Sequence, residues 1–145
     1  MRRMELSRRD LGLVLSAMAA PTTSAETQDL PTKVFHNAEM KPDQHPTNES
    51  RQFVWGRTHD GYFIDMHETQ LRAGEMPHAA HQHPHEEMTM LREGTLEVEI
   101  EGKTSRIGPG DVVYVASNQH HGWRNVGATT AKYFVIAFGR PPKQP

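Results

Sequence analysis

Two short stretches decide how this chain is interpreted: HQHPHEE at residues 81–87 and HHGWRN at residues 120–125. They supply imidazoles and carboxylates, and neutral imidazole nitrogens and carboxylate oxygens are ligands that divalent transition metals accept. On an extended strand, His81 and His83 would place both side chains on the same face, where one metal ion can take both. The two stretches therefore predict a metal centre assembled from separated parts of the chain.

The remaining ligands of this predicted centre follow from the same alternation. Glu87 has the parity of His81 and His83, and Pro84 can bend the chain so that a carboxylate starting the next strand returns to the metal. His121 would complete the set from a distant strand. The candidate metal ligands are His81, His83, Glu87 and His121, and the sequence identifies no separate general base.

Around these stretches the sequence consists of short apolar runs separated by turn signals. Leu96, Val98 and Ile100 alternate with glutamates, the pattern of a strand with one wet face. Turns are marked by pairs such as Asp60-Gly61 and Glu101-Gly102. No long helical period occurs after the N-terminal segment, so we expect an all-β antiparallel barrel or jelly roll. The expected strands contain the apolar runs at 53–55, 62–66, 88–91, 96–100, 112–116 and 133–138.

Composition narrows the classes of function. A chain of 145 residues is long enough for one domain with its own core, and it contains no cysteine, which excludes thiolate metal sites and Cys nucleophiles. The formal net charge is -2, and the body of the chain has no run of Lys and Arg. Nucleic acid is therefore not an expected partner.

The first 25 residues have the pattern of an export signal. A start rich in arginine precedes the apolar run 13–20, and Pro21 leads into small residues that end at Ala25. Ser7-Arg8-Arg9-Asp10-Leu11 resembles the twin-arginine signal, which is an address and not an anchor. An amphipathic N-terminal helix is the alternative. We expect a periplasmic or extracellular protein without a stable membrane anchor, because the apolar run is too short to span a bilayer.

Four segments are expected. A signal peptide at 1–25 precedes an extended arm at 26–50, which is polar, contains three prolines and offers one short edge strand at Val34-Phe35. The arm could pack across the barrel or onto a second subunit. The barrel follows at 51–140, and residues 141–145 form a C-terminal tail.

The spacing of the two stretches resembles that of the cupin family. The first cupin motif runs Gly, five residues, His-x-His, three or four residues, Glu, six residues, Gly, and His81, His83, Glu87 and Gly94 match it. Gly74 lies one residue too far from His81, which suggests a longer turn before the motif.

The second cupin motif runs Gly, five residues, Pro-x-Gly, two residues, His, three residues, Asn. Gly110, His121 and Asn125 match it, whereas Ala116 and Asn118 replace its Pro and Gly. Asn tolerates the left-handed backbone conformation, so the turn can survive the replacement. The resemblance implies a double-stranded β-helix barrel, a jelly roll, with the four candidate ligands around a metal inside it.

Other readings of the same residues remain open. The histidines could form a solvated loop without a metal. His85 and His78 are more typical of surface or neighbouring positions than of ligands, and His120 should point away from His121. Trp123 could line a pocket or simply pack in the core. The methionines at 66, 76, 88 and 90 are more typical of core packing than of copper ligation.

The expected cofactor is one divalent transition metal: Mn, Fe, Ni, Cu or Zn. Three imidazoles and a carboxylate leave coordination positions open. Together with the resemblance to cupins, this implies a small-molecule metal-dependent oxidoreductase of the dioxygenase type. A non-catalytic module that binds a metal or small molecule and a redox-neutral isomerase or lyase are the alternatives. A transcriptional sensor is disfavoured because no DNA-binding region is visible. The outer faces of a small barrel are commonly covered by a second copy, so a homodimer is expected.

Overall fold

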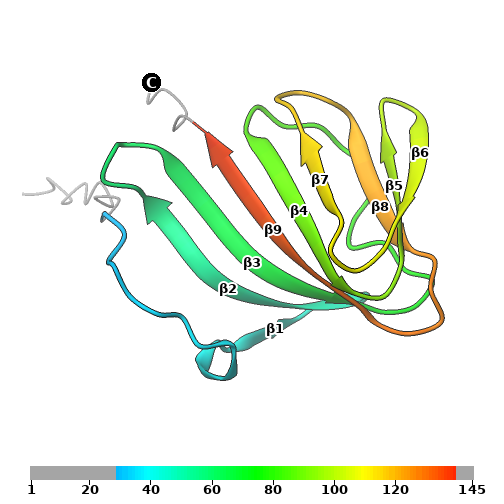
Figure 1. Ribbon diagram of the computed structural model, residues 1–145, viewed down its shortest axis with the longest axis horizontal. Coiled ribbons are helices and arrows are strands. Elements are labelled where there is room, and N and C mark those ends of the chain that lie inside the picture. Colours follow the sequence, from blue (N-terminus) through cyan, green and yellow to red (C-terminus); the bar gives the residue numbers. More distant parts are fainter. Residues whose placement is uncertain (1–28, 140–145) are drawn as a thin grey trace, which may run out of the picture.

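The computed structural model describes residues 29–139, so the predicted signal peptide and C-terminal tail lie outside the described residues. The described chain forms two antiparallel sheets (Figure 1). The larger sheet has six strands in the order β1-β2-β3-β9-β4-β7, and the smaller has three in the order β6-β5-β8. The strands are β1 (Pro42–Gln44), β2 (Asn48–Arg57), β3 (Phe63–Leu71), β4 (Glu86–Glu93), β5 (Leu96–Ile100), β6 (Lys103–Ile107), β7 (Val112–Val115), β8 (His121–Asn125) and β9 (Ala131–Gly139).

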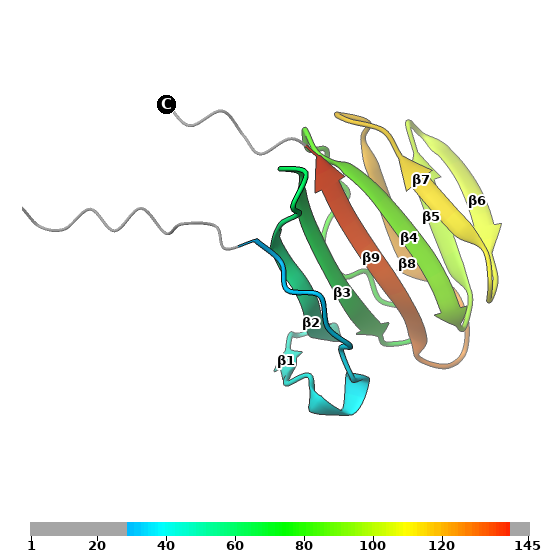
Figure 2. The same cartoon turned by 60° about the vertical axis from the view of Figure 1, so that its left-hand side comes forward.

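The predicted all-β jelly-roll fold is confirmed. The three-stranded sheet packs against the β4, β7 and β9 side of the large sheet, whereas β2 and β3 extend beyond it (Figure 2). The predicted strand at 96–100 has the bounds that its alternation indicates. Two described strands, β1 and β6, were not anticipated. The sequence of β6, KTSRI, is polar and almost wholly exposed. It is held by pairing with β5 from Leu96 opposite Ile107 to Ile100 opposite Lys103.

The core lies between the two sheets and is built from alternate residues of each strand. Its fully or nearly fully buried members are Leu71, Leu91, Leu96, Val98, Val113, Val115, Trp123, Ala131, Tyr133 and Val135. The indole N–H of Trp123 donates to the Tyr133 hydroxyl at 3.1 Å, which satisfies one polar group in the core. Burial raises the pKa of Tyr133, so its phenol stays protonated there.

Asn125 holds the end of β8 to two other segments. The side chain is fully buried, and its amide donates to the carbonyl oxygens of Leu71 at 2.9 Å and Thr129 at 2.8 Å. Its side-chain oxygen accepts from the Gly127 N–H at 3.0 Å. Through these three hydrogen bonds, Asn125 joins β3, β8 and the turn before β9.

The N-terminal arm differs from the expectation. Val34 and Phe35 lie outside any strand, and Val34 is 73% exposed. The free edge of β2 is taken instead by β1, which pairs Pro42 opposite Arg51 and Gln44 opposite Glu49. Val34 and Phe35 have no free strand edge beside them, so they cannot form the backbone hydrogen bonds of a sheet.

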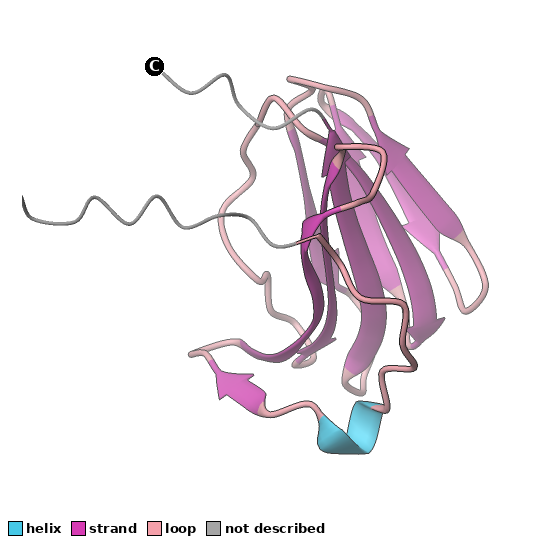
Figure 3. Ribbon diagram, turned by 90° about the vertical axis from the view of Figure 1, so that its left-hand side faces the viewer, coloured by secondary structure: helices cyan, strands magenta, loops and turns pink. Residues whose placement is uncertain are grey.

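A short 3-10 helix, η1 (Asn37–Glu39), precedes β1 (Figure 3). Asn37 ties the arm to the barrel, because its amide donates at 2.7 Å to the buried carboxylate of Glu68 on β3. The first strands, β1 and β2, begin before residue 51, where the barrel was expected to start.

Within residues 29–139 no helix is long and apolar enough to cross a membrane.

Candidate metal centre

Three of the four predicted ligands come together inside the fold. His81, His83 and His121 each offer a ring nitrogen, and these nitrogens all lie within 4.8 Å of one another. His121 is on β8 and is 1% exposed, whereas His81 and His83 precede β4. The backbones of His81 and His121 exchange two hydrogen bonds, of 2.9 and 2.8 Å. This antiparallel bridge joins the two stretches that the sequence had separated.

His81 and His83 do not converge as neighbours on a regular strand, which corrects the sequence-based expectation. His81 forms an isolated bridge, His83 lies outside any strand, and β4 begins at Glu86. Hydrogen bonds to the turn before β8 hold the loop instead: Asn118 N–H donates to the His83 carbonyl at 2.8 Å and Ser117 Oγ to the Pro84 carbonyl at 2.7 Å. The two imidazoles therefore owe their positions to contacts with another segment.

The turn that contains Asn118 adopts a left-handed conformation without a glycine. Asn118 has a φ of +61°, which lies in the left-handed region that glycine and asparagine tolerate best. The predicted survival of this turn is thus confirmed. Its N–H is the donor that holds His83 in place.

Gly122 permits the close contact between the two stretches, a role that the sequence did not reveal. A Cβ at this position would lie 2.9 Å from Cβ and 3.1 Å from Cα of Ala80. These contacts are shorter than van der Waals distance, so a larger residue would push the segment that carries His81 away from β8. The close contact between Gly122 and Ala80 exists only in the folded chain, where the two segments are paired.

Hydrogen bonds orient two of the imidazoles toward the centre. Nδ1 of His83 lies 2.9 Å from the His85 carbonyl oxygen, and Nδ1 of His121 lies 2.9 Å from the Gln119 carbonyl oxygen. A carbonyl only accepts, so each Nδ1 is the protonated nitrogen and each Nε2 keeps its lone pair. Metal-binding histidines are typically oriented by such bonds on the other ring nitrogen.

Each of the three imidazoles has one ring nitrogen that is buried and has no hydrogen-bond partner. They are Nε2 of His83, Nε2 of His121 and Nδ1 of His81, and Oε1 of Glu87 is in the same condition. Buried polar atoms without partners are rare in folded proteins, because each costs about 1–3 kcal/mol. Nitrogen lone pairs and a carboxylate oxygen facing one another fit a divalent transition metal, which would satisfy them together.

Glu87 and His85 form a second, overlapping group with His83. Glu87 is 7% exposed, and its Oε2 lies 3.3 Å from Nε2 of His83. His85 stacks on the His83 ring with centroids 3.5 Å apart, and the donor atoms of these three residues also lie within 4.8 Å of one another. Glu87 thus contacts the centre through His83, and the four-residue ligand set stays a prediction. His85 lies closer to the ligands than its sequence position indicated.

The surroundings favour the neutral form of two of these imidazoles. Burial lowers the pKa of His81, and the neighbouring histidines His78, His121 and His83 lower it further. Burial also lowers the pKa of His85, with His83 acting in the same direction. A neutral imidazole keeps a lone pair, which is the form that a metal binds.

Comparison with known proteins agrees with this geometry. Residues 67–137, which run from β3 through both stretches to β9, match the family model described as Cupin domain. Residues 67–137 are thus similar to a cupin domain. A search of curated proteins found no match.

Solved structures share this cupin fold. KdgF from Halomonas sp. has a TM-score of 0.64 and 19% identity, with 74% of this chain and 94% of that chain covered. A predicted oxalate decarboxylase from Thermotoga maritima has a TM-score of 0.63 and 19% identity, covering 72% and 97%. The polyketide cyclase RemF from Streptomyces resistomycificus has a TM-score of 0.62 and 21% identity, covering 77% and 83%. At these identities the likeness concerns the fold.

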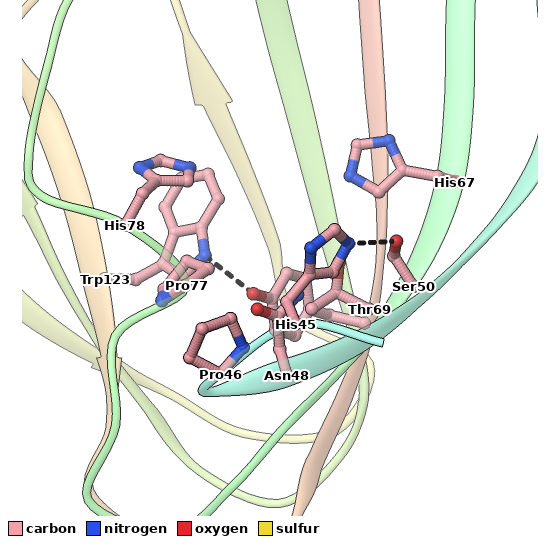
Figure 4. Close-up of a pocket in the computed structure, with 10 residues that line it drawn as sticks. His45, Pro46, Asn48, Ser50, His67, Thr69, Pro77, His78 and Trp123 are labelled. Atoms are coloured by element: carbon pink, nitrogen blue, oxygen red, sulfur yellow. Dashed lines mark hydrogen bonds between the residues drawn. The ribbon is translucent and has the colours of Figure 1, made fainter. Parts of the chain in front are cut away.

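A cavity of about 330 Å³ adjoins the histidine cluster. His78 and Trp123 line it, and their rings lie 4.5 Å from that of His81 and 5.7 Å from that of His121. Figure 4 shows His45 and His67 on the side facing them. Neither His45 nor His67 lies in the two motifs; His45 is brought here by the turn between β1 and β2, and His67 by β3.

His67 is paired with a carboxylate in the wall of this cavity. Nδ1 of His67 lies 3.6 Å from Oδ1 of Asp65, which also accepts a 2.7 Å hydrogen bond from Gln52. Burial raises the pKa of Asp65, but the nearby His67 imidazole and the hydrogen bond from Gln52 outweigh burial and lower the pKa overall. Asp65 is therefore ionised near neutral pH and holds one face of the His67 imidazole.

Replacing His121 tests the centre directly. We expect His121→Ala to weaken Zn²⁺ binding by at least about a hundredfold, because even the loss of a group that only orients a ligand costs about 10- to 100-fold. Equilibrium dialysis with elemental analysis measures the affinity, and circular dichroism checks that the variant is folded. His120→Ala is the matched control, since His120 is adjacent but exposed. Equal losses in both variants, or no loss in His121→Ala, would contradict the assignment.

Proposed function

We propose that this protein is a metal-dependent cupin enzyme that acts on a small molecule as an oxidoreductase of the dioxygenase type. The ligands would be His81, His83, Glu87 and His121, and the ion one of Mn, Fe, Ni, Cu or Zn. The observation that carries the proposal is that ring nitrogens of His81, His83 and His121 lie within 4.8 Å of one another, and that each of these rings has a buried nitrogen without a hydrogen-bond partner.

The residues of the centre would leave the ion reactive. Three neutral imidazoles and one carboxylate reduce a divalent charge to about +1 and leave coordination positions unfilled. A bound ion would polarise a substrate oxygen and, where its redox state can change, support chemistry with dioxygen. His83 and His121 are held by backbone carbonyls, so the donor geometry is prepared before a ligand arrives.

The rest of the site would position the substrate. The cavity beside the cluster is lined by His67, whose Nδ1 lies 3.6 Å from the Asp65 carboxylate. The Trp123 and Tyr133 rings close the core side of the cavity against water. An open metal position next to a walled cavity favours catalysis over a structural role for the ion.

A redox-neutral reaction is the second candidate. It is supported by the names of two structures that share the fold, a predicted oxalate decarboxylase and a polyketide cyclase. Because one fold hosts many reactions, these names carry less weight than the donor set itself. A module that only holds a metal-bound small molecule is the remaining alternative.

We also propose that the protein is exported and forms a homodimer. The export proposal rests on the arginine pair and apolar run in residues 1–25, which lie outside the described residues. The dimer proposal rests on the outer face of the large sheet, where Met90 is 44%, Val112 49% and Tyr114 51% exposed. These residues lie on the paired strands β4 and β7 beside Met88 and Phe134, and a contiguous apolar face of this kind commonly packs against a second copy.

Turnover distinguishes the reaction types. Protein loaded with each of the five metals is incubated with catechols, flavonols, oxalate and diketones, with and without dioxygen, while product and dioxygen are both measured. We expect metal-dependent conversion that consumes dioxygen and is abolished in His121→Ala. Conversion without dioxygen uptake would favour the redox-neutral reaction, and tight binding without conversion would favour the binding module.

The export proposal predicts the compartment of the protein. The full chain should be found outside the cytoplasm after cell fractionation, and changing both Arg8 and Arg9 to Lys should retain it inside, because the twin-arginine signal is read by its receptor. A variant with Arg2 and Arg3 changed to Lys serves as the control. Equal export of all three proteins would refute the twin-arginine assignment.

The dimer proposal predicts the mass of the protein in solution. Sedimentation equilibrium should give twice the chain mass for the wild type and a monomer for Met90→Lys/Tyr114→Lys, because burying two unpaired charges in an apolar interface is unfavourable. Thr104→Lys, an exposed position on β6, should leave the dimer intact. A monomeric wild type would refute the proposal.

A further inference from the structure

We infer that Glu101 is a positioning residue of the metal centre, and that it acts on His121 through the peptide group that joins Gln119 to His120. Its carboxylate fixes the orientation of the His121 imidazole and increases the donor strength of the ring nitrogen that faces the other imidazoles. The inference rests on the proposed metal centre and deepens it, because it assigns an outer group to one of the ligands.

Glu101 occupies a turn position that its residue type does not favour. It is the first of the two residues between β5 and β6, and its φ is +48°, followed by +73° at Gly102. A two-residue hairpin turn with both φ angles positive is typically Asn-Gly or Asp-Gly. The left-handed conformation is unfavourable for a glutamate, because its Cβ lies too close to the following carbonyl oxygen. A residue in such a conformation must be held there by other contacts.

The contact that holds Glu101 is a pair of hydrogen bonds to the backbone of His120. Glu101 N–H donates to the His120 carbonyl oxygen at 2.9 Å, and His120 N–H donates to Oε1 of Glu101 at 2.6 Å. These bonds extend the pairing of β5 with β8 one residue beyond Ile100 opposite His121. In a regular antiparallel pair, both bonds would join backbone groups. Here the side-chain carboxylate takes the place of the backbone carbonyl.

The N–H that Glu101 accepts belongs to the same peptide group as the carbonyl that orients His121. The carbonyl oxygen of Gln119 accepts from Nδ1 of His121 at 2.9 Å, whereas the N–H of His120 donates to the carboxylate. Because a peptide group is planar, its C=O and N–H turn together. One carboxylate therefore fixes the plane of the group that holds the His121 ring.

The negative charge of Glu101 also reaches the ring through this peptide group. Hydrogen bonds in a chain polarise one another, so a charged acceptor on the N–H makes the C=O of the same peptide a stronger acceptor. The Gln119 carbonyl then holds the Nδ1 proton of His121 more firmly, which increases the basicity of Nε2. A carboxylate bonded directly to a metal-binding histidine has the same effect. In this protein one peptide group lies between the two.

The opposite side of β8 shows why this support is needed. The backbone of His121 bonds to His81 at 2.9 and 2.8 Å, on the side of the strand away from β5. Those bonds place the backbone of the ligand, but they leave the rotation of its ring to the bond at Nδ1. The support from Glu101 completes the set, because it fixes the acceptor of that bond.

The first test compares Zn²⁺ affinity between variants of the full-length protein, by competition with a chromophoric chelator. Glu101→Asn tolerates the positive φ but has a side chain one methylene shorter. We expect it to weaken Zn²⁺ binding about three- to tenfold, the change expected from one hydrogen bond. Thermal unfolding of the metal-free variant should occur at the wild-type temperature or higher, because Asn suits the turn.

Two further variants separate the hydrogen bond from the charge. Glu101→Gln keeps an oxygen at the same distance and should lose less affinity than Glu101→Asn. Glu99→Gln removes a charge from an exposed residue of β5 that lies opposite Gly122, so it should leave the affinity unchanged.

The second test needs no metal. Long-range proton–nitrogen NMR correlations of the imidazole rings report which nitrogen carries the proton in the metal-free protein. We expect His121 to carry it on Nδ1 in the wild type and to exchange between both nitrogens in Glu101→Asn, because the Gln119 carbonyl is then less firmly held. A residue that only stabilised the turn would leave this proton in place.

The outcomes separate the inference from the proposal on which it rests. A Zn²⁺ affinity or a His121 tautomer that is equal in the wild type and Glu101→Asn would overturn the inference and leave the metal centre standing. Equal losses of affinity in Glu101→Gln and Glu99→Gln would also overturn it, because charge alone would then suffice. Failure of the wild type to bind Zn²⁺ would overturn the metal centre and the inference with it.

Discussion

The pair of backbone hydrogen bonds between His81 and His121 is the constraint on which the site depends. It joins a loop that precedes β4 to the first residue of β8 in the other sheet, and it places three imidazoles within reach of one ion. The contact needs the bare backbone of Gly122, because Ala80 lies where a Cβ would stand. It also needs the left-handed turn at Asn118, whose N–H holds His83. Metal-binding geometry is therefore a property of backbone pairing as much as of the side chains.

The same arrangement creates a local instability that a ligand could relieve. Backbone carbonyls fix the protons of His83 and His121 on Nδ1, so their Nε2 atoms face one another as bare acceptors. With Glu87 Oε1 and His81 Nδ1, these atoms are buried without partners. Elsewhere in the core, Asn125 makes three hydrogen bonds and Trp123 donates to Tyr133, although Thr89 Oγ1 is also buried without a partner. Concentrating unsatisfied acceptors at one point is the pattern expected where binding free energy offsets a cost in folding.

The division of the barrel into a packed half and an open half places the cavity. The three-stranded sheet covers the β4, β7 and β9 side, where the aliphatic core lies, whereas the inner faces of β2 and β3 carry polar side chains such as Ser50, His67 and Thr69. The cavity forms where these two halves meet, beside the histidine cluster. Its lining residues include no Asp, Glu, Lys or Arg, unlike the outer face of the same sheet, where Arg92 and Glu68 form an ion pair at 2.7 Å. A substrate would thus meet the ion from the polar side and the aromatic rings from the core side.

Whether the sequence alone determined a feature depends on how far apart in the chain the interacting residues lie. Alternation at 96–100 predicted β5 to the residue, and the motif spacings predicted that His81, His83 and His121 would meet, because both signals depend on strand parity and chain length. Only the tertiary structure revealed β6, since its polar sequence is ordered by pairing with β5, and only it excluded a strand at Val34-Phe35, where no free edge is available. The roles of Gly122, His45, His67 and Asp65 were likewise invisible, because each depends on a contact with a residue far away in the chain or on the cavity that such contacts enclose. Local patterns therefore predicted the ligands, whereas the pairing of distant segments decided their geometry and the chemistry of the space beside them.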